Sequence, residues 1–109
     1  MPEAERELIE QFQTLQQQLQ ATLIQKENVK LQHLEAEKAL DELMKSDAKE
    51  AYKIAGSIMI KKEVSEIKKD LEERIEDLDL RMKTMEKTEE RIVSKLKEME
   101  PKLKKLMAQ

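Results

Sequence analysis

Apolar residues recur through the first part of the chain in alternating steps of four and three. The series contains Leu8, Phe12, Leu15, Leu19, Thr22, Lys26, Val29, His33, Ala36, Leu40 and Leu43. Eight of these eleven positions are apolar, and a repeat of this kind over about five heptads is typical of one seam of a coiled coil. The pattern therefore predicts a helix over residues 4–45.

A second series with nearly the same spacing follows after a break. It contains Ile67, Leu71, Ile75, Leu78, Met82, Met85, Glu89, Ile92, Leu96, Met99 and Leu103. We predict a second helix over residues 66–100, with Ser65 as its N-cap. Because proline lacks an N–H and costs about 3 kcal/mol inside a helix, we expect this helix to kink or end near Glu100. Residues 101–109 would then form a loose tail.

Two arms of similar length on either side of a break indicate that the chain folds back on itself. If Leu40 faces Leu71 in an antiparallel pair, the other seam positions face one another in order, and Thr22 faces Glu89. The polar side chains of Thr22 and Glu89 then lie in one layer. This keeps the Glu89 carboxylate away from an apolar partner, and a polar layer can fix the register. A parallel homodimer of each arm predicts no such match, so the sequence favours an antiparallel two-helix coiled-coil hairpin.

The middle segment, AYKIAGSIMIKKE, differs from both arms. It predicts a β-hairpin over residues 51–62 with a three-residue loop, Ala55–Ser57, in which glycine supplies the positive φ. This register would place four apolar side chains on one face, namely Tyr52, Ile54, Ile58 and Ile60. A two-residue loop at Gly56 and Ser57 would divide them between the faces. A helical interpretation is disfavoured by Gly56 and by the β-branched run.

An isolated two-stranded hairpin is marginal in water, and both of its edges offer unpaired backbone groups. We therefore expect the four apolar residues of the hairpin, Tyr52, Ile54, Ile58 and Ile60, to form an oligomer interface. Hairpins from several subunits would close into an intersubunit β-barrel platform that leaves no free edge. The fold class predicted from the residues is thus mainly α, with one central β-hairpin that serves assembly.

At the open ends of the arms, Leu8 with Leu103 is the last apolar layer, and Leu106 and Met107 have no apolar partner. The apolar residues of these tips are Leu8, Ile9, Phe12, Leu103, Leu106 and Met107. Exposed apolar surface of this kind marks binding sites, and methionine adapts to varied partners. From the residues alone, a binding surface and an ordinary frayed end of a coiled coil remain equally open.

Composition supports this architecture and narrows the function. Among 109 residues, 41% are charged and 2% are aromatic, with no cysteine and a net charge of −3. This favours one domain built of long solvated helices and argues against a nucleic-acid partner. No signal peptide and no apolar run of membrane length is found, so we expect a cytoplasmic protein without a membrane partner.

The sequence also offers no candidate for catalysis. No phosphate-binding loop and no pair of nucleophile and base is present, so we expect no enzymatic activity and no cofactor. His33 is the only histidine, and its place on the seam predicts a structural role and no metal site.

Several stretches resemble the prefoldin family, specifically its beta-type subunit as found in archaea. They are the Gln-rich EQFQTLQQQLQATLIQKENVKLQ of the first arm, EAEKALDEL at its end, the hairpin AYKIAGSIMIKKE, and EDLDLRMKTMEKTEERIVSKLKEME in the second arm. One hairpin, not two, marks the beta type.

The resemblance implies a hexamer of two alpha-type and four beta-type subunits, whose hairpins form a double β-barrel bearing six coiled coils. It implies an ATP-independent holdase that captures unfolded proteins at the tips and delivers them to a group II chaperonin. The six tip residues then become the client-binding residues. The alternative is a structural coiled-coil adaptor or tether that does not bind unfolded chains.

Overall fold

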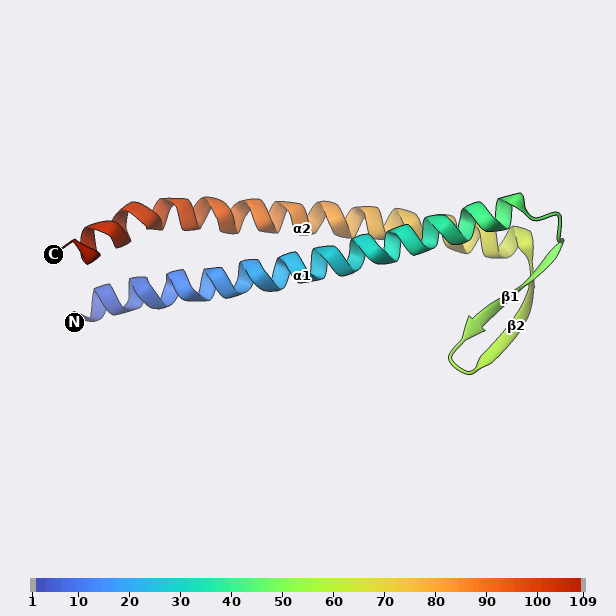
Figure 1. Cartoon of the computed structure of the whole chain (residues 1–109), viewed down its shortest axis with the longest axis horizontal. Coiled ribbons are helices and arrows are strands. Elements are labelled where there is room, and N and C mark those ends of the chain that lie inside the picture. The colour runs from blue at the N-terminus through green and yellow to red at the C-terminus, as the bar shows by residue number, and fades with distance from the viewer. Residues whose placement is uncertain (1, 109) are drawn as a thin grey trace. The chain divides into compact units, whose positions relative to one another are not determined.

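The computed structural model describes residues 2–108 and consists of two long helices that flank one β-hairpin (Figure 1). The elements are α1 (Glu3–Lys45), β1 (Glu50–Ala55), β2 (Ile58–Glu63) and α2 (Val64–Met107). The chain divides into two compact units. The terminal unit comprises residues up to Asn28 and from Met82 onward, and the hairpin unit comprises Val29–Arg81.

The seam predicted from the sequence is the part of each helix that is shielded from solvent. Every seam position is buried or partly buried, whereas most other helical positions are exposed. The most deeply buried apolar residues all lie on the seam, namely Val29, Ala36, Leu78, Ile92 and Met99. The core is therefore a narrow stripe along each helix, as the spacing of four and three predicts.

Contacts within each unit confirm that α1 and α2 run antiparallel. In the terminal unit, Lys26 contacts Glu89, and Ile9 lines one hollow with Leu106. In the hairpin unit, His33 contacts Asp79, and the Lys49 carbonyl accepts from the Val64 N–H. Position numbers thus rise along α1 while they fall along α2.

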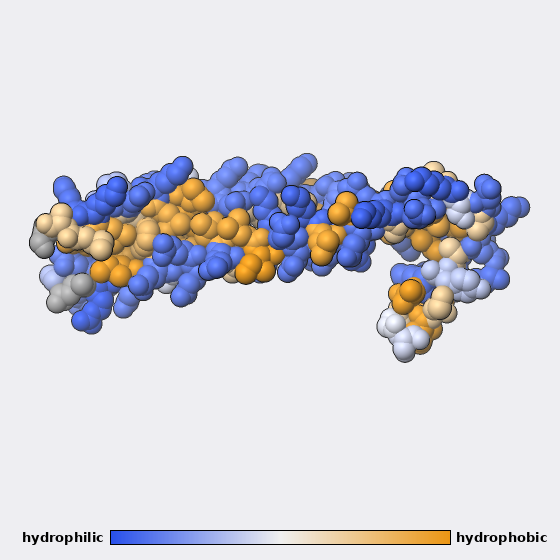
Figure 2. Space-filling model, viewed as in Figure 1, coloured by the Kyte–Doolittle hydropathy of each residue, from blue (hydrophilic) through white to orange (hydrophobic). Residues whose placement is uncertain are grey.

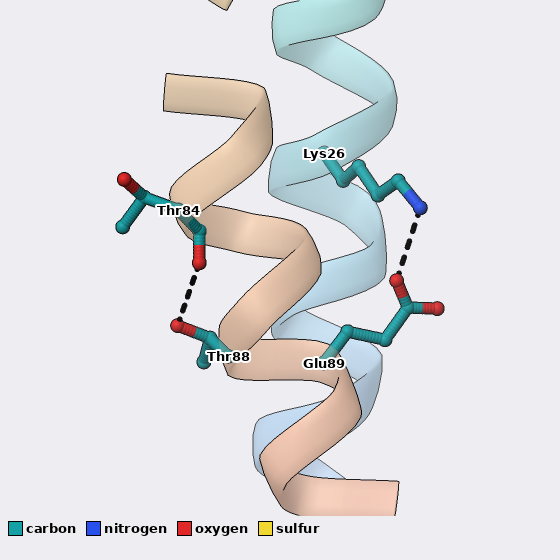
Figure 3. Close-up of polar contacts among 4 residues, drawn as sticks. All are labelled: Lys26, Thr84, Thr88 and Glu89. Carbon is teal, nitrogen blue, oxygen red and sulfur yellow. Dashed lines mark hydrogen bonds and ion pairs between the residues drawn. The ribbon is translucent and has the colours of Figure 1, made fainter. Parts of the chain in front are cut away.

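A polar pair interrupts the seam of the terminal unit (Figure 3). Lys26 Nζ donates a hydrogen bond to Glu89 Oε2 at 3.0 Å. The sequence predicts that Thr22 faces Glu89 across the seam, but the hydrogen-bond partner of Glu89 is Lys26. The buried Thr22 hydroxyl instead donates to the carbonyl of Gln18, at 2.8 Å, within its own helix. The longer lysine side chain reaches the carboxylate and neutralises it, which a hydroxyl cannot do.

The hairpin has a different register from the one predicted. Ala55 pairs with Ile58 and Ile54 pairs with Met59, so the loop has two residues, Gly56 and Ser57. The predicted pairs of Ile54 with Ile58 and of Tyr52 with Ile60 are wrong. Because register alternates side chains between faces, Tyr52 and Ile54 lie on one face and Ile58 and Ile60 on the other.

The conformation of Gly56 explains this register. Its φ is 61°, and no other described residue has a positive φ. A type II′ turn requires glycine at the first of two central positions, which is where Gly56 lies. In the common three-residue loop, the left-handed residue comes last and would be Ser57, so the position of the glycine selects the shorter loop.

The second helix is longer than predicted at both ends. It begins at Val64, whose backbone N–H donates to the carbonyl of Lys49 at 2.9 Å, so Ser65 is not the N-cap. It also continues through Pro101 to Met107, so the predicted loose tail is wrong. Pro101 lies on the exposed side, where water can satisfy the carbonyl that proline leaves without a donor.

The half-buried residues Leu103 and Leu106 follow Pro101 on the shielded side. Their burial offsets part of the cost of the proline and holds the last turns in place. Figure 1 shows α2 bending but unbroken towards its red end.

The Lys26–Glu89 pair predicts a loss of stability at high pH. The hydrogen bond to Glu89 raises the pKa of the Lys26 ammonium above its ordinary value of 10.5, against the opposing effect of desolvation. A group whose pKa is raised by folding stabilises the fold below its unfolded pKa, and this contribution is lost as the pH rises through the folded value. We expect the fall in Tm above about pH 10.5 to be smaller in Glu89→Gln than in the native chain, as measured by circular dichroism. Lys45→Met, which removes an exposed pair with Asp41, is the control and should leave the fall unchanged.

Gly56→Ala should destabilise the hairpin, because an L-residue in a left-handed conformation costs about 1–2 kcal/mol. No atom lies within 4 Å of the added Cβ, so the effect comes from the backbone and not from a clash. We expect roughly tenfold faster hydrogen exchange of the β1 and β2 amides, with Ser57→Ala as the unaffected control. Equal exchange in the two variants would contradict the turn assignment.

Candidate functional site

The ends of α1 and α2 in the terminal unit enclose a hollow of about 510 Å³. Its lining is mainly apolar and comprises Ile9, Phe12, Leu103, Leu106 and Met107, together with Glu5, Gln13 and Gln16. The structure thus brings together five of the six tip residues named from the sequence. The sixth, Leu8, is half buried and does not line the hollow.

The accessibility of the lining side chains is graded. Ile9, Phe12, Leu103 and Leu106 are half buried, whereas Met107 is 87% exposed. Figure 2 shows that apolar surface continues along this unit between two polar borders. A partly shielded apolar floor with a flexible methionine beside it can accept apolar side chains of varied shape.

Sequence reasoning did not identify the polar residues of the hollow. Gln13 and Gln16 follow Ile9 at steps of four and three, beside the seam, and this spacing was the available signal. Glu5 is the one charged residue among those that line the hollow. A second hollow in the same unit, of about 760 Å³, has a mixed lining that includes the charged residues Glu7, Glu10, Lys95 and Glu98. Of these two hollows in the terminal unit, the one at the tip has the more apolar lining.

The hairpin is the second uncovered apolar surface. Its large side chains are strongly exposed: Tyr52 61%, Ile54 71%, Ile58 62%, Met59 63% and Ile60 42%. Figure 2 shows apolar surface on this segment. The strands β1 and β2 pair only with each other in the part of the chain that the structure describes. Met59 was missed from the sequence because the predicted register put it on the opposite face from the other four.

His33 lies between two carboxylates. Its Nδ1 is 2.5 Å from Glu37 Oε1, and its Nε2 is 2.8 Å from Asp79 Oδ1. Within residues 2–108, no cluster of three or more histidine, cysteine, aspartate or glutamate side chains is arranged to hold a metal ion. None of the helices described is sufficiently long and apolar to span a membrane.

The architecture defines a class of protein before any comparison is made. Two antiparallel helices carry an apolar tip, and the β-hairpin between them exposes apolar side chains on both faces. Such a chain is a coiled-coil subunit of a larger assembly, because an isolated hairpin of this kind is marginal in water.

Comparisons with known proteins identify the family. A family model described as prefoldin subunit matches residues 6–109. The chain is 35% identical over 109 residues to a prefoldin subunit beta of Archaeoglobus fulgidus, covering 99% of this chain and 94% of the relative. It is 38% identical over 109 residues to the prefoldin subunit beta of Methanothrix thermoacetophila, covering 99% and 90%.

A solved structure agrees with these relatives. The crystal structure of the prefoldin beta subunit from Thermococcus strain KS-1 matches with a TM-score of 0.83 and 32% identity, covering 96% of this chain and 93% of that one. The chain therefore belongs to the prefoldin family. Its resemblance to the beta-type subunit is confirmed, and its function is that of a prefoldin chaperone subunit, which assembles with other prefoldin subunits.

Proposed function

We propose that this chain is one of four beta-type subunits that form a hexamer with two alpha-type subunits. The hexamer acts in the cytoplasm as an ATP-independent holdase, which binds unfolded proteins at the coiled-coil tips and transfers them to a group II chaperonin. The observation that carries the proposal is the mainly apolar hollow at the tip, lined by Ile9, Phe12, Leu103, Leu106 and Met107.

The hollow supports binding of unfolded chains because such chains expose the apolar side chains that native proteins bury. Burial of one large apolar side chain gives about 1.5–3 kcal/mol, and association itself opposes binding. One tip therefore binds weakly, and several tips held by one hub add their contributions through effective concentration. Weak contacts at each tip also permit release without nucleotide hydrolysis.

Assembly through the hairpins supports the hub. Both edges of the two-stranded sheet present unpaired backbone groups, and adjoining hairpins satisfy them by strand pairing. Closure into a barrel leaves no edge and buries one face of each hairpin. The proposal treats residues 1–109 as one prefoldin-like domain, and the match of the family model to residues 6–109 supports it. It needs no cofactor and carries no enzymatic activity, and its partners include neither nucleic acid nor membrane.

A double change at the tip tests client binding. Ile9→Ser with Leu106→Ser removes two apolar side chains of the hollow and leaves in place the seam layers up to Leu8 with Leu103. We expect about tenfold more hexamer to be needed to suppress aggregation of a denatured client, as followed by light scattering. Leu23→Ser, at an exposed position on α1, is the matched control and should behave as the native chain. Equal suppression by the double variant, at native hexamer mass, would place client binding elsewhere.

A charged pair in the hairpin tests assembly. Ile54 and Met59 are cross-strand partners, so Ile54→Asp with Met59→Asp places two like charges opposite each other on an apolar surface. We expect native mass spectrometry to show no hexamer, while circular dichroism retains the helical signal. Ser57→Asp, in the turn, should still assemble. A hexamer that persists in the double variant would refute assembly through this surface.

A further inference from the structure

The hairpin has two apolar faces, and closure into a barrel covers only one of them. The Tyr52 face carries Tyr52, Ile54 and Met59, with Glu50, Lys61 and Glu63 towards its base. The Ile58 face carries Ile58 and Ile60, with Ala51, Lys53, Ala55 and Lys62. Whichever face lines the barrel, exposed isoleucine, methionine or tyrosine side chains remain on the other and need a second cover.

The charges of the two faces differ. On the Tyr52 face, Lys61 Nζ forms an ion pair with Glu50 Oε2 at 2.7 Å, and Glu63 adds a second carboxylate. The Ile58 face has two lysines, Lys53 and Lys62, and no acidic residue. The Ile58 face is thus an apolar surface with a positive charge, and its complement is an apolar surface with carboxylates.

Helix α1 offers such a surface in the hairpin unit. A hollow of about 510 Å³ lies on its last turns, lined by Leu34, Glu37, Lys38, Leu40, Asp41 and Met44. All six residues, which we call the α1 outer patch, come from one helix. Leu34 is 48% exposed and Met44 is 57% exposed, so no other described element covers them.

We propose, on the basis of the hairpin-mediated assembly above, that the Ile58 face of one copy packs on the α1 outer patch of a second copy. Lys53 and Lys62 then lie against the acidic residues Glu37 and Asp41, whose exposed carboxylates pair within the single chain with His33 and Lys45. The Tyr52 face, with the larger apolar cluster, is left for the interior of the barrel. Ile58 and Met44 are both open to solvent within a single chain, so the contact is made between chains.

The two surfaces also match in length. Leu34 and Met44 are ten residues apart on a helix, a rise of about 15 Å. The Ile58 face extends over four residue steps from Ala51 to Ala55, or about 13 Å of strand. One hairpin face therefore covers the patch from end to end. The contact would fasten the base of one arm to the sheet of its neighbour.

Cysteine cross-linking tests the contact, because the chain contains no cysteine. A copy with Met44→Cys is mixed with a copy with Ile58→Cys, assembled with an alpha-type subunit and mildly oxidised. We expect a disulfide-linked pair of the two copies. The matched control combines Met44→Cys with Met59→Cys, since Met59 is the neighbour of Ile58, is 63% exposed against 62%, and lies on the other face. The yield with Ile58→Cys should be at least about fivefold higher.

The outcomes separate this contact from the proposed function. A hexamer of native mass in which the Met59→Cys pair links equally well, or in which neither pair links, overturns the contact and leaves the hexamer standing. Absence of any hexamer from unmodified subunits refutes both. A chain that carries Met44→Cys and Ile58→Cys together and links internally as a dilute monomer shows an intrachain contact and also overturns the proposal.

A charge exchange provides a second measurement. Lys53→Asp should weaken assembly about tenfold at low salt, and adding Asp41→Lys in the same chain should restore most of the loss. The same Lys53→Asp change combined with Glu63→Lys, on the Tyr52 face, should not restore it. Equal rescue by both changes would show a general charge effect and no contact with Asp41.

Discussion

The apolar seam between α1 and α2 is the interaction on which the rest of the structure depends. It uses one stripe of each helix, and its burial is deepest at Val29, Ala36, Leu78, Ile92 and Met99. A two-helix seam has no second layer, and among the described residues the hairpin side chains and Met107 at the tip stay exposed. The proposed function uses both apolar surfaces, the hairpin for assembly and the tip for client binding.

The polar pair within the seam limits how the helices can pair. Lys26 and Glu89 satisfy each other at 3.0 Å with about a quarter of each side chain exposed. A shift of register would leave a partly shielded ammonium and carboxylate beside apolar neighbours, which costs more than the pair gains in place. The pair therefore contributes to specificity more than to stability, in the way that polar layers do in other coiled coils.

The seam could be predicted from the sequence because a helical face is defined by spacing alone, and spacing is visible in the residues. The hairpin register could not be read in the same way, because a shift of one residue exchanges the faces while the alternation of residue types stays nearly the same. The position of Gly56 decides the register, because a glycine with positive φ at the first central position fits a two-residue loop. The end of α2 was predicted wrongly because only the local cost of Pro101 was considered. Leu103 and Leu106, which follow it, are half buried, and their burial keeps the helix continuous. The polar part of the tip hollow could not be predicted from the sequence. Gln13 and Gln16 lie beside the seam, and polar residues at such positions are usually solvated.

The two open apolar surfaces, at the hairpin and at the tip, differ in the backbone groups they present. The hairpin combines apolar side chains with unpaired backbone groups along its edges, so its contacts are directional and select another strand. At the tip, no strand edge is present among the described residues, and the hollow is lined mainly by apolar side chains of α1 and α2. Contacts there have no preferred direction and gain little from any one partner. Under the proposed function, an assembly surface made of strand and a client surface made of helix ends would allow one short chain to form a fixed hub while binding many sequences weakly. If helix ends formed the hub, no strand pairing would fix its register. If strands formed the tip, their open edges would favour aggregation by strand pairing.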